Sequence, residues 1–182
     1  MLRLFSWELF RFEKPLTEPG KLGLIVLLCT LWLMLGLAGH DPWKQDDAIG
    51  PINHIVKSGD WVVPVLAGEA FLTKPPLYYV TAASFADFIP WLTRHDAMRL
   101  ASGFYMALTL FFISLTGREL WGRGHGRVSA LILIGSVGLI VHSHEMITET
   151  ALLAGLAMAF YGLTFSVRRS VTAGLFIGTG IG

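Results

Sequence analysis

The sequence predicts an all-α fold, a polytopic bundle of membrane helices with one large external loop. Of its 182 residues, 53% are hydrophobic and only 15% are charged, and the mean hydropathy is +0.59. Such values are not typical of a soluble globular domain. Four apolar stretches are each long enough to cross a hydrocarbon core about 30 Å thick as a helix. A fifth apolar run ends the sequence.

Composition also excludes several classes of protein. The 14 Lys and Arg residues nearly balance the 13 Asp and Glu residues, so the chain offers no polybasic surface for nucleic acid and no acidic tail. The single cysteine, Cys29, lies within an apolar run. One cysteine excludes both a disulfide framework and a cysteine-rich zinc module.

Residues 1–21 are expected to form a cytoplasmic segment before the first span. Apolar residues recur at helical spacing within residues 1–12, which predicts either an amphipathic helix on the bilayer surface or a simple basic anchor. Three glutamates precede the first apolar run, which is too long for the hydrophobic part of a cleaved signal peptide. We therefore expect a retained signal anchor.

The predicted spans cover about 22–39, 100–117, 128–143 and 150–167, and the last run covers 170–182. A helix that stopped partway across the bilayer would leave backbone carbonyls unsatisfied in lipid. We therefore expect 170–182 to be a truncated span, so that 22–182 form the N-terminal part of a longer transmembrane domain. Glycines at 178, 180 and 182 predict close packing between helices.

Segment 75–92 is as long as a span, but it begins with two prolines and carries Asp87 and Pro90. The basic residues decide its placement, because cytoplasmic loops are enriched in Lys and Arg. If the segment lies on the surface and the N-terminus is cytoplasmic, nine of the 14 basic residues are cytoplasmic. Residues 40–99 then form an external loop whose interfacial helix holds aromatic rings at headgroup depth. These rings belong to Tyr78, Tyr79, Phe85, Phe88 and Trp91.

Two polar clusters lie on the external side in this topology. One occupies residues 40–60, and the other is the short connection 142–149 between two predicted spans. Ionisable residues at the membrane are usually functional. We expect the bundle to bring the two clusters together into a site at the membrane surface, suited to a substrate whose tail stays in lipid.

Asp46, Asp47 and Lys74 are the leading candidate site residues. Adjacent carboxylates repel each other, so in a partly buried site one aspartate would hold its proton more tightly and could act as a general base. The alternative is a solvated pair in a loop. Lys74 precedes Pro75-Pro76, whose rigid backbone could fix its ammonium near the headgroups to hold a lipid phosphate. The alternative is a snorkelling lysine.

His142, His144 and Glu145 are candidates for a divalent metal site. A hydrolytic zinc site would need a second histidine four residues after His144, and position 148 is threonine. A looser divalent site shared with other residues stays open, and no other cofactor is predicted.

Several motifs occur in order along residues 46–102, and two more follow at Ser143-His144-Glu145 and Thr148-Glu149. The first set comprises Asp46-Asp47, Ser58-Gly59-Asp60-Trp61-Val62-Val63-Pro64, Ala67-Gly68-Glu69-Ala70-Phe71, Lys74-Pro75-Pro76-Leu77-Tyr78-Tyr79 and Arg99-Leu100-Ala101-Ser102. Together they resemble the GT-C glycosyltransferases, in particular the group of aminoarabinose transferases and protein O-mannosyltransferases. The resemblance covers most of residues 22–170.

This resemblance implies a multi-pass enzyme of the bacterial cytoplasmic membrane that serves cell-envelope or lipid A modification. Such an enzyme takes a sugar from a polyprenyl-phosphate carrier and transfers it, with inversion, to a lipid or protein acceptor at the outer face. The resemblance implies Asp46 as the base and Asp47 as its neighbour or metal partner. Lys74, with Tyr78 and Glu149, would bind the lipid phosphate.

The chain departs from the family pattern at some of these positions, since Asp47 replaces a glutamate and Glu149 replaces an aspartate. The alternative function is that of a noncatalytic transport or assembly subunit, or of an inactive truncated relative. Transporters usually place ionisable residues near the membrane midplane. Predicted spans 100–117 and 128–143 contain no Asp, Glu, Lys or Arg, which favours chemistry at the surface.

Overall fold

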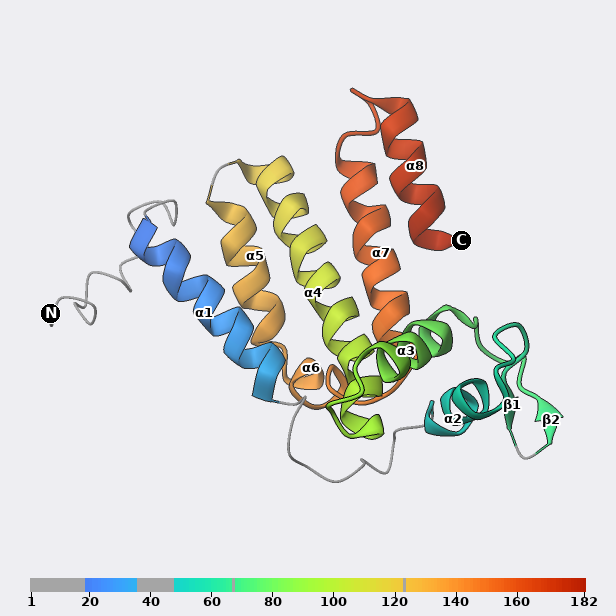
Figure 1. Ribbon diagram of the computed structural model, residues 1–182. Helices are drawn as coiled ribbons and strands as arrows, with labels where there is room; N and C mark the ends of the chain where they lie inside the picture. Colours follow the sequence, from blue (N-terminus) through green and yellow to red (C-terminus); the bar gives the residue numbers. More distant parts are fainter. Residues whose placement is uncertain (1–18, 36–47, 67, 123) are drawn as a thin grey trace, which may run out of the picture. The chain divides into compact units, whose positions relative to one another are not determined.

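The computed structural model describes residues 19–35, 48–66, 68–122 and 124–182. Within these ranges the chain is mainly α-helical, with eight helices and one short hairpin (Figure 1). This confirms the predicted all-α class. The helix expected at 1–12 and the candidate catalytic pair Asp46-Asp47 lie outside the described residues.

The chain divides into two compact units. Unit 1 takes its residues from 1–32, 109–136 and 155–182, and unit 2 takes them from 33–108 and 137–154. The helices are α1 (Pro19–Leu35), α2 (Ile49–Ser58), α3 (Leu77–Phe88), α4 (Arg94–Trp121), α5 (His125–Ile134), α6 (Val137–His142), α7 (Glu149–Thr164) and α8 (Ser170–Ile181); β1 (Val65–Leu66) pairs antiparallel with β2 (Glu69–Ala70).

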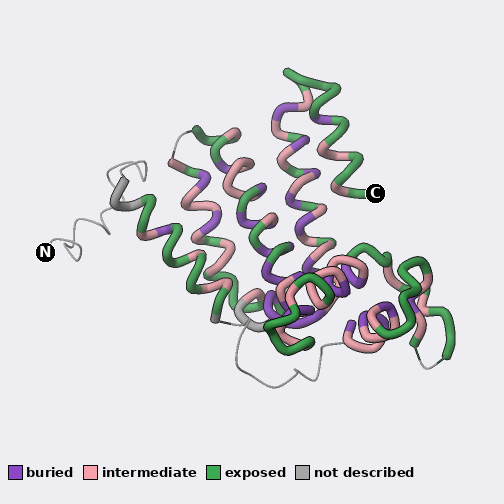
Figure 2. Tube along the Cα trace, in the orientation of Figure 1, coloured by how far each residue is buried: buried purple, intermediate pink, exposed green. Residues whose placement is uncertain are grey.

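Unit 2 is organised around one hydrophobic core. The buried faces of α2 and α3 pack there with the first half of α4 and with Met146. Ile52 and Ile55, three residues apart, form the buried face of α2. Gly59 ends that helix in the left-handed conformation, with φ of 72°, and its N–H donates to the Ile55 carbonyl. Figure 2 shows that α2 and α3 each contain both buried and partly exposed residues.

Unit 1 contains closely packed helices. A Cβ atom on Gly155 would clash with the Gly180 carbonyl oxygen, and one on Gly180 would lie 2.9 Å from the Ala159 nitrogen. The backbones of α7 and α8 therefore meet at these glycines, as helices in membranes often do. Gly180 matches the close packing expected from the glycines near the C-terminus, whereas a Cβ atom on Gly178 would meet nothing within 4 Å.

Within the described ranges, α4 alone is both long and apolar enough to cross a membrane, judged by length and composition. The apolar parts of α1, α5, α7 and α8 are shorter, at 10–17 residues. The expected span 100–117 lies inside α4, which starts earlier because Thr93 caps it. The Asp96 N–H donates to Thr93 Oγ1, and that hydroxyl donates to Asp96 Oδ2 over 2.6 Å.

The apolar run 128–143, expected to form one continuous span, is two helices. α5 ends at Ile134 and α6 starts at Val137. Between them, the Ser136 N–H bonds to the Leu133 carbonyl and its hydroxyl bonds to the Ile132 carbonyl. Next to Gly135, these hydrogen bonds replace the regular backbone hydrogen bonds of an α-helix. The hydropathy of the sequence does not reveal this break between two helices.

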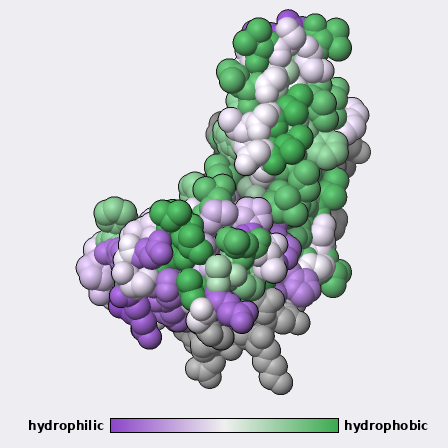
Figure 3. All heavy atoms as spheres, turned by 90° about the vertical axis from the view of Figure 1, so that its right-hand side faces the viewer, coloured by the Kyte–Doolittle hydropathy of each residue, from purple (hydrophilic) through white to green (hydrophobic). Residues whose placement is uncertain are grey.

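The segment 75–92 contains α3, which has only 12 residues. A helix of this length reaches about 18 Å, less than the thickness of a hydrocarbon core. The surface location expected for segment 75–92 stays a prediction. Figure 3 shows hydrophilic residues gathered around α2 and the hairpin, whereas the surface of α8 is mostly hydrophobic.

Candidate functional site

Lys74 lies at the end of the loop that leads from β2 into α3. Pro76 is the N-cap of α3, so Lys74 immediately precedes two residues with restricted backbone angles. Its ammonium donates to Glu149 Oε1 over 2.8 Å, and the two side chains are 32% and 54% exposed. The backbone therefore presents the cation at a partly solvated position within unit 2.

Glu149 is the first residue of α7, where the helix dipole favours a negative charge. Partial burial alone would raise the pKa of Glu149. Hydrogen bonds from Lys74, from the Glu149 backbone N–H and from Thr148, together with the charge of Lys74, outweigh it and lower that pKa. The carboxylate is consequently ionised at neutral pH and holds the Lys74 ammonium.

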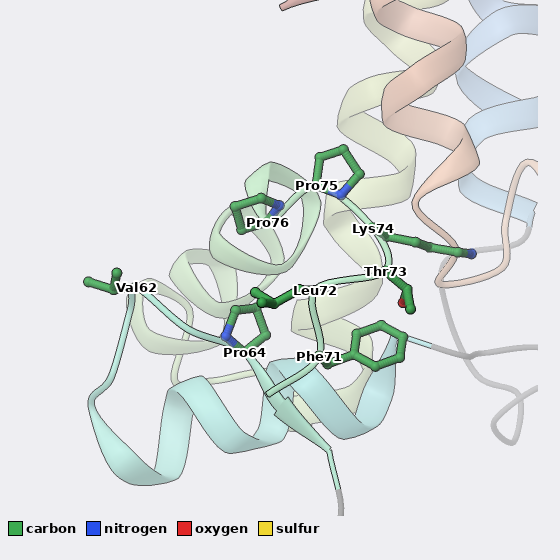
Figure 4. Close-up of a pocket in the computed structure, with 8 residues that line it drawn as sticks. All are labelled: Val62, Pro64, Phe71, Leu72, Thr73, Lys74, Pro75 and Pro76. Carbon is green, nitrogen blue, oxygen red and sulfur yellow. The ribbon is translucent and has the colours of Figure 1, made fainter. Parts of the chain in front are cut away.

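A cavity of about 310 Å³ adjoins Lys74. Figure 4 shows the residues that line it: Val62, Pro64, Phe71, Leu72, Thr73, Lys74, Pro75 and Pro76. The lysine side chain extends away from the two prolines, and the remaining lining is mainly apolar. The Lys74 ammonium points away from the other lining residues, towards Glu149, so the apolar hollow lies next to the cation and does not enclose it.

The connection 142–149 is held against three other segments of unit 2. The Ala48 N–H donates to the Met146 carbonyl over 3.1 Å. The Ser102 hydroxyl donates to the Glu145 carbonyl over 2.7 Å, so the Tyr78 hydroxyl must be the donor in its own 2.7 Å bond to Ser102. These bonds bring together residues far apart in the sequence. Ala48 is the residue that follows Asp47.

Tyr78 occupies a different position from the one expected for a ligand of lipid phosphate. Its side chain is 1% exposed, it stacks on Tyr105, and its hydroxyl bonds to Ser102. Tyr79 is buried as well, whereas Phe88 and Trp91 are exposed. The tyrosines at the start of α3 therefore belong to the core of unit 2. The aromatic content of a segment does not show which of its residues face a protein core and which face the membrane interface.

The three metal candidates are only partly assembled. His142 Nδ1 lies 2.8 Å from Glu145 Oε2, whereas His144 Nδ1 lies 3.1 Å from the Ser143 hydroxyl. Glu145 and His144 are buried. Across residues 19–35, 48–66, 68–122 and 124–182, no group of three or more His, Cys, Asp and Glu side chains is placed to hold a metal ion. The described part of the site therefore presents a His–Glu pair.

Sequence reasoning did not single out Arg99 or Ser102 as site residues, although both stand in a motif quoted above. Both are 0% exposed, on adjacent turns of α4. Arg99 Nη2 lies 3.5 Å from His95 Nε2. A buried arginine is costly unless it is paired. The signal that could have identified them is an arginine and a serine three residues apart at the start of the apolar part of α4.

Asp60 forms a separate turn after α2. Its Oδ1 accepts the Val62 N–H over 2.9 Å, and the N–H groups of Val62 and Val63 lower the pKa of this carboxyl. The Ser58 hydroxyl accepts the Asp60 N–H. The Ser-Gly-Asp motif is therefore a turn that ends α2 and directs the chain towards the hairpin.

Comparisons with models of protein families, with curated proteins and with solved structures find no match to this chain. The site residues therefore carry the functional argument. They provide a fixed cation, an acidic partner, an adjoining apolar hollow and a nearby chain segment that begins just after two aspartates.

Proposed function

We propose that this protein is an integral-membrane glycosyltransferase of the polytopic GT-C type. It would transfer a sugar from a polyprenyl-phosphate carrier to a lipid or protein acceptor at the outer face of the bacterial cytoplasmic membrane. One observation carries the proposal. Lys74 is held by Glu149 at the start of α7, beside the connection to which the residue after Asp47 is also bonded.

Lys74 would bind the lipid phosphate of the donor. As the bond between the anomeric carbon and the phosphate oxygen breaks, negative charge grows on that oxygen. A fixed ammonium therefore stabilises the transition state more than the ground state. Glu149 positions the ammonium before the donor arrives, and the apolar wall of the adjoining cavity suits the first part of the polyprenyl chain.

Asp46 would remove the proton from the acceptor hydroxyl or phosphate. The acceptor oxygen then attacks the anomeric carbon from the face opposite the departing phosphate, so one bond forms, one breaks and the configuration inverts. Asp47 would assist as its neighbour. The bond between Ala48 and Met146 supports this assignment, because it ties the chain next to the aspartates to the segment that carries Glu149.

The membrane arrangement belongs to the same proposal. α4 would cross the bilayer. The apolar helices α1, α7 and α8, and α5 together with α6, would cross it as parts of longer or tilted spans. The loop 40–99 and the connection 142–149 would lie at the external surface. In that case the donor would enter laterally from the lipid, and no nucleotide sugar would be needed.

The decisive experiment measures sugar transfer from a labelled polyprenyl-phosphate donor, in membranes that contain the complete protein. Asp46→Asn, Lys74→Gln and Glu149→Gln are compared with Lys57→Gln, which removes an exposed lysine from α2 in the same unit. Asp46→Asn and Lys74→Gln are expected to lower the turnover number by about 100-fold or more. Lys57→Gln is expected to leave it unchanged.

Equal loss in all four variants would point to a folding defect, which membrane insertion and thermal unfolding would reveal. If Asp46→Asn retains full activity, the base is another residue. If the wild-type protein transfers no sugar from any donor in a broad panel, the glycosyltransferase proposal fails and a noncatalytic membrane subunit replaces it.

A further inference from the structure

Unit 1 contains a second cavity, separate from the residues assigned to sugar transfer. Its volume is about 450 Å³, and its lining comes from the ends of α4 and α7, from the turn between α7 and α8, and from the first turns of α8. None of its lining residues belongs to the glycosyl-transfer site proposed above.

The floor of this cavity is aromatic and well ordered by ring contacts. The ring centroids of Tyr161 and Phe165 are 4.9 Å apart, those of Tyr161 and Phe176 are 5.2 Å apart, and both pairs are edge to face. Phe165 is buried. Edge-to-face pairs favour fixed ring positions, so the floor is an apolar surface of defined shape.

The rim of the cavity is cationic. Arg168 and Arg169 line it, with a single carboxylate, Glu119, which accepts a hydrogen bond from Arg168 Nη2. Two guanidinium groups against one carboxylate leave a net positive charge. Guanidinium groups present several donors in a planar fork that matches the oxygens of a phosphate.

The start of α8 adds further donors on the same rim. Arg169 is the N-cap residue and makes no side-chain cap, and the Ala173 N–H is the first to bond back to it. The amides before Ala173 are thus the free donors that every helix N-terminus presents. Thr172 lines the cavity beside them.

We propose that this cavity binds the phosphate group of an anionic membrane lipid. The aromatic floor and the net positive rim match a charged headgroup joined to apolar chains. Val167 and Val171, next to the rim in sequence, are among the most exposed apolar residues of the described chain, as expected for residues that face acyl chains. In the predicted topology both arginines are cytoplasmic, where basic pockets between helices bind anionic lipid headgroups.

The test is lipid retention by the purified complete protein, measured by native mass spectrometry. Phosphatidylglycerol and phosphatidylcholine with identical acyl chains are the probes. Wild type is expected to retain phosphatidylglycerol preferentially, and Arg169→Gln is expected to weaken this retention about fivefold. Arg118→Gln is the matched control, because Arg118 is an exposed arginine in the last turn of α4 and does not line the cavity.

Glu119→Gln provides a test in the opposite direction. Removal of this carboxylate frees Arg168 and raises the net charge of the rim, so phosphatidylglycerol retention is expected to increase. A merely structural role for Glu119 would not produce that increase. Equal retention by wild type, Arg169→Gln and Arg118→Gln would overturn the proposal.

Glycerol 3-phosphate at millimolar concentration distinguishes a lipid from a soluble phosphate ester. If it displaces phosphatidylglycerol from wild type at that concentration, the site prefers a soluble phosphate and the lipid assignment is overturned. No displacement supports the lipid. None of these measurements requires sugar transfer, so their outcome is independent of the catalytic proposal.

Discussion

Lys74 and Glu149 combine two properties that a phosphate site needs. Each is partly exposed, at 32% and 54%, so an incoming anion can reach the ammonium. Their 2.8 Å contact also fixes the lysine before the anion arrives. A pair with this much solvent contact contributes little to stability, at most about 1 kcal/mol. Its value therefore lies in positioning the cation.

The ionisation of Glu149 gives a pH prediction. Because the pKa of Glu149 is lowered in the folded protein, its stabilising contribution is complete above its unfolded pKa of about 4.3 and is lost as pH falls through the lower folded pKa. Lys74→Gln should raise the pKa of Glu149. Carbon-13 NMR of the seven glutamate carboxylates, assigned with Glu149→Gln, measures this directly.

Stability measurements provide the accompanying check. The melting temperature of Lys74→Gln should lie slightly below that of wild type at pH 7, and the two should converge below about pH 4. A difference that grows as pH falls would contradict the assigned sign.

Ser102 gives a second prediction, because it connects two buried partners. Ser102→Ala leaves the Glu145 carbonyl without its donor and the Tyr78 hydroxyl without its acceptor from Ser102. The expected cost is about 1–3 kcal/mol of unfolding free energy. Tyr78→Phe keeps the Ser102–Glu145 bond, so it should cost less, about 0.5–1.5 kcal/mol. Denaturant unfolding in detergent micelles measures both.

Ser84→Ala is the control for this comparison. The Ser84 hydroxyl bonds only locally, to the Val80 carbonyl within α3, and such bonds add little to helix stability. If Ser84→Ala proves as costly as Ser102→Ala, the connection between α4 and residue 145 is not what stabilises unit 2.

Helix pairs depend on backbone approach as much as on side chains, and α7 with α8 shows this most clearly. Gly155→Ala should destabilise unit 1 by about 1–3 kcal/mol, because the new methyl group meets the Gly180 carbonyl oxygen and neither backbone can yield easily. Thermal unfolding in micelles measures the effect. Gly174→Ala, in α8 with open space around the new Cβ atom, should be neutral or stabilising by up to about 1 kcal/mol. Equal effects would mean that the two helices do not pack at Gly155.

The elements that could be predicted are those determined by nearby residues in the sequence. Apolar length predicted a helix over 100–117, and the structure has α4 there. The start of α4 at Arg94 depends on the Thr93–Asp96 capping pair, which hydropathy does not detect. The break at Gly135-Ser136 depends on backbone hydrogen bonds inside an apolar run. Polar caps and local bonds shift helix ends without changing mean hydropathy.

The candidate site was predictable to a similar degree. Lys74 and Glu149 were named from sequence patterns and a family resemblance, and the structure places them in contact. Tyr78 was assigned to a ligand, yet its hydroxyl lies in the core. Its role depends on Ser102, 24 residues away, and no local pattern indicates which distant residue will meet a hydroxyl.

The positions of the basic residues bear on the orientation of the protein in the membrane. The proposed transfer residues lie in unit 2, and Arg118, Arg127, Arg168 and Arg169 lie in unit 1. The positive-inside rule predicts that these four arginines are cytoplasmic, and the proposed topology places Lys57, in the loop 40–99, outside.

Site-directed labelling tests this orientation. With Cys29 replaced by serine, Lys57→Cys should react with a membrane-impermeant maleimide in intact cells whose outer membrane has been opened. Arg118→Cys should react only after the inner membrane is permeabilised. Both positions are exposed in the structure, so the difference would report sidedness. If Arg118→Cys is labelled in intact cells and Lys57→Cys is not, the topology is the reverse of the one proposed.

The contact between Lys74 and Glu149 joins residues 75 positions apart in the chain, and this has a consequence for biogenesis. At about 5–20 residues per second, a ribosome needs about 4–15 s to add those residues. α2 is complete before that interval and α3 is complete early in it, whereas Met146, which belongs to their shared core, is added only near its end. The nascent segment must therefore wait with part of its apolar surface uncovered, and it would gain from a chaperone or from the membrane insertion machinery until α7 emerges.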